Sequence, residues 1–247
     1  MSLPHPNKTL PTQLTWPWLV VLHLMPGVAF WGVFQILARI AAAQGGTVYL
    51  ALILAIPLGL VPLELGIMLH WSKKTTGRVS LRSVTENRGR RGVSDNLVIP
   101  VLLFLLLIVL SVGTGPLSVW LEGRFTGISE GLKSGILLEQ FSAASPTQRT
   151  VTFTLAALFS GFAAPIVEEA YFRGFLLPRM EFLGWVAPIL NASLFAVYHF
   201  YLPWNVPAIL VMWIPVAIVV RRRRNFVIGI IVHSAINLLA VAQLHLL

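Results

Sequence analysis

Residues 164–180 read "APIVEEAYFRGFLLPRM", a segment that places two glutamates and an arginine among apolar side chains. Between residues 150 and 177, Glu168, Glu169 and Arg173 are the only charged residues. A charged side chain at the depth of a lipid bilayer costs about 2.5–3.5 kcal/mol on insertion scales. If this segment crosses a membrane, its three charges therefore indicate a functional site, so the membrane assignment comes first.

The composition is typical of a membrane protein. Of the 247 residues, 56% are hydrophobic and 11% are charged, whereas soluble domains carry about 25% charged residues. The apolar run from Trp16 to Ala43 is longer than the core of a signal peptide, so we expect it to remain as a span. The chain has no cysteine, which excludes disulfides, thiolate metal sites and cysteine nucleophiles. We expect a single integral membrane domain, residues 1–247, with a motif-bearing core at 150–240.

The apolar runs predict an all-α fold, a polytopic transmembrane helical bundle of about seven spans, with eight as the alternative. Each run is near the ~20 residues that cross a bilayer, and the sixth is the weakest. We expect a polar cavity between the C-terminal helices and a short interfacial helix at residues 130–141. The predicted spans are 16–43, 48–71, 97–121, 150–177, 183–202, 204–220 and 226–245.

Lysine and arginine are concentrated in alternate loops, which predicts the orientation. The loops 72–96 and 221–225 are strongly basic, those near 44–47 and 203 carry no such residue, and the loop 122–149 is the exception. We expect a cytoplasmic N-terminus in a prokaryotic inner (plasma) membrane. The net charge of +9 then orients the chain and attracts anionic membrane lipid, and we expect no nucleic-acid binding. The basic residues on the predicted inner side are Lys8, Lys73, Lys74, Arg78, Arg82, Arg88, Arg90, Arg91, Arg179 and Arg221 to Arg224.

The spacing of the polar residues predicts how they meet. Residues four apart share a helix face, so Arg173 is expected to pair with Glu169. Glu168 is turned by about 100° around the helix axis from Glu169, so it faces a different partner. Two further spans carry polar side chains at depth, so three helices could converge on one polar site. These side chains are His199 in the fifth span, and His233 and Asn237 in the seventh.

Other ionisable residues within the spans have simpler interpretations. Arg39, Glu64 and His70 lie near predicted span ends, where long side chains reach the membrane interface. His23 lies deeper, and as a lone residue it is interpreted as a hydrogen-bonded interior histidine rather than a ligand.

Three motifs carry a family resemblance: "EEAYFR" at 168–173, "FAVYH" at 195–199 and "HSAIN" at 233–237. In this order they resemble the EExxxR, FxxxH and HxxxN motifs of the CAAX protease and bacteriocin-processing (CPBP, or Abi) family of intramembrane proteases. That family includes the type II CAAX prenyl endopeptidases. The resemblance implies an all-helical membrane fold and hydrolysis of a peptide bond. It implies a protein or peptide substrate, either a prenylated CAAX protein or a processed peptide such as a bacteriocin leader.

The same resemblance implies roles for six residues of this chain. Glu168 is the general base that activates water, and His199 positions the water or a metal ion. The supporting residues are Glu169 and Arg173, and the donors to the tetrahedral oxyanion are His233 and Asn237.

The residues leave two hydrolytic mechanisms open. A glutamate in an apolar pocket is suited to act as a general base without a metal, and we favour this alternative. Zinc could instead be held by Glu168, His199 and His233, because His₂Glu is a known ligand set. Serine and aspartyl mechanisms lose support, because the chain has no GxSxG elbow and its only aspartate is Asp95, in a loop.

Two other functions use the same residue types. A transporter or proton relay also needs intramembrane glutamate, histidine and arginine, although the chain shows no inverted repeat. An inactive family member acting as an immunity or binding factor would retain the motifs without the activity.

Overall fold

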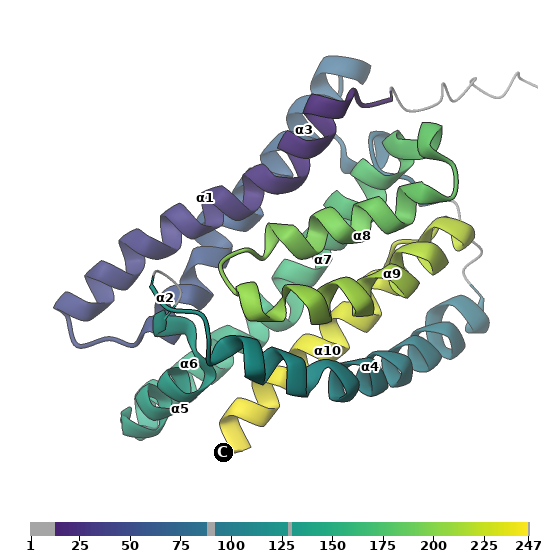
Figure 1. Ribbon diagram of the computed structural model, residues 1–247. Coiled ribbons are helices and arrows are strands. Elements are labelled where there is room, and N and C mark those ends of the chain that lie inside the picture. Colours follow the sequence, from purple (N-terminus) through teal and green to yellow (C-terminus); the bar gives the residue numbers. More distant parts are fainter. Residues whose placement is uncertain (1–12, 88–91, 128–129, 247) are drawn as a thin grey trace, which may run out of the picture.

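The structure is a computed structural model that describes residues 13–87, 92–127 and 130–246. All regular secondary structure in this part of the chain is helical (Figure 1), so the predicted all-α fold class is confirmed. Four of the basic residues used to predict orientation lie outside the described residues: Lys8, Arg88, Arg90 and Arg91.

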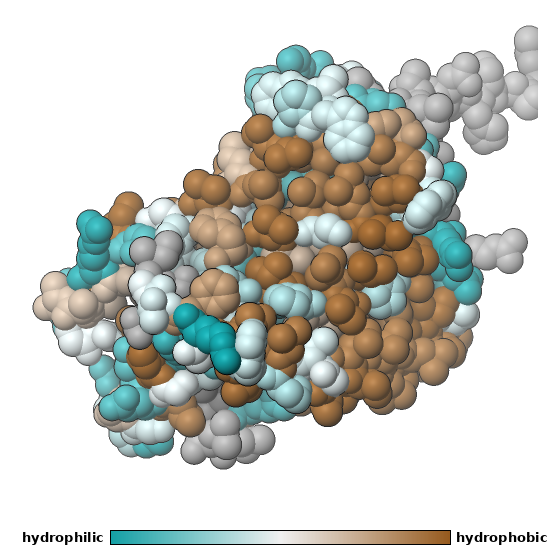
Figure 2. Space-filling view, viewed as in Figure 1, coloured by the Kyte–Doolittle hydropathy of each residue, from teal (hydrophilic) through white to brown (hydrophobic). Residues whose placement is uncertain are grey.

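Five helical runs of the described chain are long and apolar enough to cross a membrane. Their outer faces expose many large apolar side chains, and Figure 2 shows a broad apolar surface with polar residues towards its ends. These properties define an integral membrane protein. The runs are α1 (Trp16–Ala43), α2 to α3 (Val48–Thr76), η3 (Ser94–Val98) with α4 (Ile99–Glu122), α6 to η7 (Pro146–Leu183), and η8 (Pro203–Asn205) with α9 (Val206–Arg223).

Three of these runs contain π-helical turns, and in the third the π-helix is η3 (Ser94–Val98). The second run consists of α2 (Val48–Ala55), η1 (Ile56–Leu60) and α3 (Val61–Thr76). The fourth run begins as α6 (Pro146–Ala156) and ends in the 3₁₀-helix η7 (Leu177–Leu183). Between them lie the segments that carry the charged motif: η5 (Ala157–Ala163), α7 (Ala164–Glu168) and η6 (Glu169–Leu176).

The fifth predicted span was too long. The helix α8 (Val186–Tyr198) has 13 residues, fewer than the ~20 that cross a bilayer. It is short because Gly184 turns the chain with a positive φ of 54° before the helix, and because the helix ends just before His199. The sixth predicted span, the weakest from sequence, belongs to a 21-residue run that is long enough to cross. The seventh corresponds to α10 (Val227–Leu246).

The ends of the helices group as the charge pattern predicts. Lys73 and Lys74 lie in the last turn of α3, and Arg221 to Arg223 lie in the last turn of α9. In Figure 1 both ends lie towards the upper right, whereas the end of α1, the C-terminus of α10 and the short helix α5 (Ser134–Ala143) lie towards the lower left. Together with η4 (Glu130–Leu132), α5 confirms a short helix near the predicted 130–141.

α1 packs closely against the helices that carry the motifs. His23 is fully buried; its Nδ1–H donates to the Leu19 carbonyl at 2.7 Å, and its Nε2 accepts from Asn191 Nδ2 at 3.0 Å. The prediction of a hydrogen-bonded interior histidine is therefore confirmed. One turn later, a Cβ on Gly27 would collide with the backbone and ring of Tyr198, so a glycine is required where α1 meets α8.

We predict that the ends of α3 and α9 lie on the cytoplasmic side. Thr75, exposed near the end of α3, and Ala43, exposed at the end of α1, can each be replaced by cysteine in this cysteine-free chain. In intact cells a membrane-impermeant maleimide should label Ala43→Cys and leave Thr75→Cys unlabelled until the cells are lysed. Labelling of Thr75→Cys from outside would overturn the orientation.

Candidate active site

The charged motif lies where the fourth helical run changes from α-helix to π-helix. Glu168 is the last residue of α7, and Glu169 is the first residue of η6. Both carboxylates and the Arg173 guanidinium are buried. Elements from both halves of the chain enclose them, because α7 contacts α3 and α10, and η6 contacts α3, α8, α9 and α10.

Glu169 and Arg173 form the ion pair that their spacing predicts. Arg173 Nη1 lies 3.3 Å from Glu169 Oε1, and both side chains are fully enclosed. The guanidinium also lies over the Phe195 ring, 4.2 Å from its centroid. This cation–π contact adds stabilisation that grows when the cation is desolvated.

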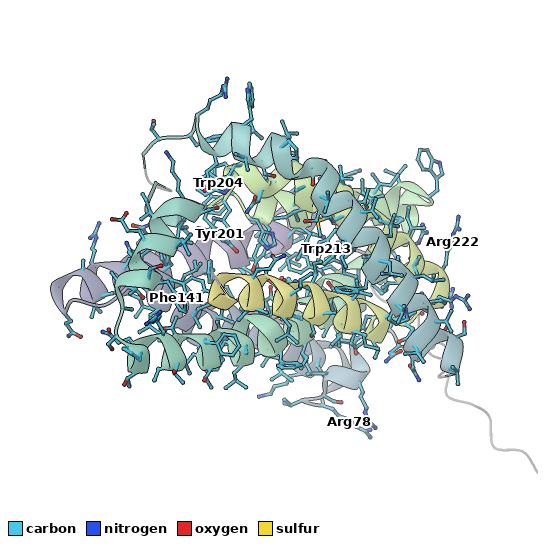
Figure 3. All side chains as sticks on the ribbon, turned by 90° about the horizontal axis from the view of Figure 1, so that it is seen from below. Arg78, Phe141, Tyr201, Trp204, Trp213 and Arg222 are labelled. Carbon is cyan, nitrogen blue, oxygen red and sulfur yellow. The ribbon has the colours of Figure 1, made fainter. Side chains whose placement is uncertain are left out.

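His233 joins α10 to both glutamates. Its Nδ1 lies 3.2 Å from Glu169 Oε1, a hydrogen bond in which the ring N–H donates to the carboxylate. Its Nε2 lies 3.7 Å from Glu168 Oε2, which is longer than a direct hydrogen bond. Trp213 of α9 packs against the same ring with centroids 4.8 Å apart, and Figure 3 shows Trp213 in the interior of the bundle.

Glu168 faces away from Arg173, as its place in the motif predicts. Its Oε1 accepts a hydrogen bond of 2.9 Å from the hydroxyl of Tyr198, the last residue of α8. The sequence prediction missed Tyr198, although this residue lies inside the quoted FAVYH motif, next to the histidine. Three elements, α7, α8 and α10, thus converge on one carboxylate.

His199 follows α8 directly and packs among aromatic rings. Its Nδ1–H donates to the Phe195 carbonyl at 2.9 Å. The Tyr198 and Phe195 rings lie 4.6 and 4.8 Å from the imidazole, centroid to centroid. Because Nδ1 is the donor, Nε2 is left as the acceptor of a neutral ring.

Asn237 lies one turn beyond His233 and contacts a different part of the fourth run. Its Nδ2 donates to the Ser160 carbonyl at 2.9 Å. In a π-helical turn this carbonyl would accept from the N–H five residues later, but that residue is Pro165, which has none. Asn237 therefore supplies the missing donor, which is the usual compensation for proline in a membrane helix.

The interpretation of Glu64 as a residue near a span end is wrong. The helical run reaches Thr76, so Glu64 lies well inside it, and the side chain is fully buried rather than at a span end. Neither carboxylate oxygen has a hydrogen-bond partner among the described residues. Glu64 interacts electrostatically with Glu168, Glu169 and Arg173 across the α3–α7 contact. Arg39 and His70 are exposed, as expected near span ends.

The positions of the possible metal ligands test the alternative in which the site holds zinc. Among the described residues, no group of three or more histidine, aspartate or glutamate side chains is placed to hold a metal ion. Glu168 and His233 face each other, but His199 does not complete them into such a group. The arrangement therefore does not fit the three-ligand zinc centre that the sequence allowed.

Residues 150–239 match the family model described as type II CAAX prenyl endopeptidase Rce1-like. This segment contains all three motifs and every residue of the site except Glu64. The match confirms the resemblance seen in the sequence, is consistent with a CPBP family protease, and supports a peptide or protein substrate. No curated protein and no solved structure matches the chain.

We predict that Gly229→Ala disables the site without adding or removing a charge. A Cβ at Gly229 of α10 would overlap Glu169 Oε2, so the carboxylate would have to leave its contacts with Arg173 and His233. Displacement of a catalytic group by about 1 Å can cost on the order of 10²-fold in rate. Peptide hydrolysis by purified protein measures the loss.

Gly66→Ala is the matched control for this variant. Gly66 lies in α3, and a Cβ there meets nothing within 4 Å. Alanine is favoured over glycine in a helix by about 1 kcal/mol, so this variant should keep its activity and its thermal stability. Equal activity of the two variants would show that Glu169 tolerates displacement.

Proposed function

We propose that this protein is an intramembrane endopeptidase in which Glu168 activates a water molecule. The single observation that carries the proposal is the geometry of the Glu168 carboxylate. Its Oε1 accepts a hydrogen bond of 2.9 Å from the Tyr198 hydroxyl, and its Oε2 lies 3.7 Å from His233 Nε2. A water molecule bridging the second oxygen and the imidazole would be held by both and would lie beside a base.

In the proposed reaction Glu168 first accepts a proton from water and later returns it to the leaving group. Glu168 takes a proton from water while the hydroxide oxygen bonds to the carbonyl carbon of the peptide. The tetrahedral oxyanion is stabilised by N–H donors, for which the second N–H of Asn237 is the candidate. His233 has already given its Nδ1–H to Glu169, so its Nε2 accepts from the water instead of donating to the oxyanion. The C–N bond then breaks as Glu168 returns its proton to the leaving amine.

The remaining residues position this base. Arg173 compensates the charge of Glu169, and Glu169 orients His233 by accepting its Nδ1–H. A carboxylate that fixes the imidazole tautomer in this way leaves Nε2 facing the reacting side. His199, with Nδ1 engaged by the Phe195 carbonyl, presents Nε2 to a water molecule or to the substrate.

The family match favours a CAAX-type substrate, and we propose a protein or peptide that approaches from the cytoplasmic side of a prokaryotic inner membrane. Whether the substrate carries a prenyl group is decided by comparing cleavage of farnesylated and unmodified forms of one peptide pool. The transporter alternative expects ion or solute flux without cleavage, and the inactive alternative expects neither.

We predict that Glu168→Gln abolishes peptide cleavage in a folded protein. Glutamine preserves size and the hydrogen bond from Tyr198 but has no basic lone pair, and loss of a general base costs typically about 10²–10⁴-fold. Cleavage of a labelled peptide library and thermal unfolding in detergent should be measured on the same preparation. Cleavage at the wild-type rate with glutamine at this position would end the proposal.

Glu169→Gln is the matched comparison on the neighbouring residue. This change leaves the buried Arg173 without its charge partner, and breaking such a pair costs about 3–5 kcal/mol. Both the unfolding temperature and the rate should therefore fall, whereas Glu168→Gln should lower the rate alone.

We predict that activity survives removal of metal ions. Dialysis of active protein against a chelator should leave the cleavage rate unchanged, and metal analysis should find far less than one zinc per chain. Loss of activity on chelation, restored by zinc and accompanied by loss of zinc in His233→Ala, would instead establish a metalloprotease.

A further inference from the structure

Two buried hydrogen-bond donors adjoin His233 and take no part in the hydrolysis as described so far: the indole N–H of Trp213 and the hydroxyl of Ser234. Trp213 is 4% exposed and Ser234 is 8% exposed. Neither polar atom has a hydrogen-bond partner in the part of the chain that the structure describes. Buried donors are almost always satisfied in folded proteins, so each of these exceptions calls for an explanation.

The indole of Trp213 packs directly against the site. Its ring centroid lies 4.8 Å from that of His233, with the two rings at 74°, and 5.9 Å from the guanidinium carbon of Arg173. The helix α9 thereby contributes to the site although it carries none of the three motifs. Ser234, in contrast, is turned by about 100° around α10 from His233, so its hydroxyl faces a different neighbour. The donor beside the imidazole is therefore the indole N–H.

The oxyanion of the proposed reaction has a use for this donor. Negative charge develops on the peptide oxygen as the hydroxide adds, and donors already in place in a site without water stabilise it. Asn237 offers a single N–H, because its other one is held by the Ser160 carbonyl, and His233 gives its Nδ1–H to Glu169. An acceptor that exists only during the reaction explains why the indole N–H has no partner within the protein.

We propose that Trp213 is a catalytic residue whose indole N–H donates to the tetrahedral oxyanion, an inference that rests on the proposed function. An indole nitrogen can only donate, so it does not compete for the proton that Glu168 carries. The N–H bond stays intact throughout: the oxyanion gains one hydrogen bond and releases it when the carbonyl re-forms. Phe195, with its ring centroid 5.9 Å from the indole, and His233 hold the ring in place.

The first test is Trp213→Phe, which keeps an aromatic ring and removes the N–H. Loss of one oxyanion donor costs about 10²–10³-fold in kcat. Because the donor acts only on the transition state, KM should stay within about twofold of the wild-type value. Both constants are measured on peptide cleavage by purified protein. A kcat within about threefold of wild type would overturn the assignment.

An isosteric replacement separates the donor from packing, since phenylalanine is smaller than tryptophan. Benzothienylalanine, introduced at position 213 by nonsense suppression, keeps the bicyclic shape and places sulfur where the N–H was. It should lower kcat as much as Trp213→Phe does and keep the wild-type unfolding temperature in detergent. Wild-type turnover with this residue would assign the effect of Trp213→Phe to packing and overturn the donor.

Two variants serve as matched controls. Ser234→Ala removes the other unpaired donor, and Trp204→Phe removes an indole that is 2% exposed and packs beside Phe125 on η8, with centroids 6.5 Å apart. Both should keep the wild-type kcat. An equal loss in Trp204→Phe and Trp213→Phe would mean a general packing effect and overturn the assignment. A loss in Ser234→Ala alone would move the donor to the serine.

Comparison with Glu168→Gln separates the donor from the proposed base. Cleavage that survives Glu168→Gln but falls with Trp213→Phe would overturn the base and support the donor, and the reverse would keep the base and overturn the donor.

A binding measurement needs no turnover. It uses a pool of phosphinic peptides, whose tetrahedral P–O⁻ group stands in for the oxyanion, and a pool of the parent peptides. Glu168→Gln protein should bind the phosphinic pool about tenfold more tightly than the double variant with Trp213→Phe, and both proteins should bind the parent pool equally. Equal binding of the phosphinic pool by the two proteins would overturn the donor even if no peptide is cleaved.

Discussion

The buried ion pair between Glu169 and Arg173 is the contact on which the rest of the site depends. Removing one partner of such a pair leaves an uncompensated charge away from water, which is why these pairs demand further partners. Glu169 obtains a second one from His233, and α10 comes close enough because Gly229 leaves room for the Glu169 carboxylate. The approach of α10 in turn brings its imidazole to the oxygen of Glu168 that Tyr198 does not occupy.

Aromatic side chains enclose the pair and link it to the remaining helices. Phe195 of α8 lies under the Arg173 guanidinium, and its ring centroid is 5.9 Å from that of Trp213 and 6.0 Å from that of His233. The same rings that stabilise the cation also exclude water from it, which strengthens every charge interaction inside. The FxxxH motif therefore packs its phenylalanine against the guanidinium, in addition to placing His199 beside Tyr198.

Sequence patterns predicted the helices and the pairing of Glu169 with Arg173, because each follows from periodicity or spacing along one helix. The meeting of the three motifs was predicted because each places polar side chains at membrane depth on a separate span. These patterns could not predict Tyr198 as a partner of Glu168, since that contact depends on where α8 ends. Nor could they predict that Asn237 would donate to Ser160, because the demand for that donor arises from a π-helical turn before Pro165. Glu64 was predicted to lie near a span end because the apolar pattern ended the second span at residue 71, whereas the helical run continues for five more residues to Thr76.

Glu64 changes the electrostatics that any mechanism must satisfy. With it, three buried carboxylates interact with one guanidinium, which pairs directly with Glu169. Like charges in a shared apolar space repel one another, and neither oxygen of Glu64 has a hydrogen-bond partner in the part of the chain that the structure describes. Any mechanism in which Glu168 acts as a base therefore has to accommodate Glu64 as a neighbouring buried carboxyl group. The N-terminal half of the chain, which carries none of the three motifs, thus contributes a charge to their chemistry.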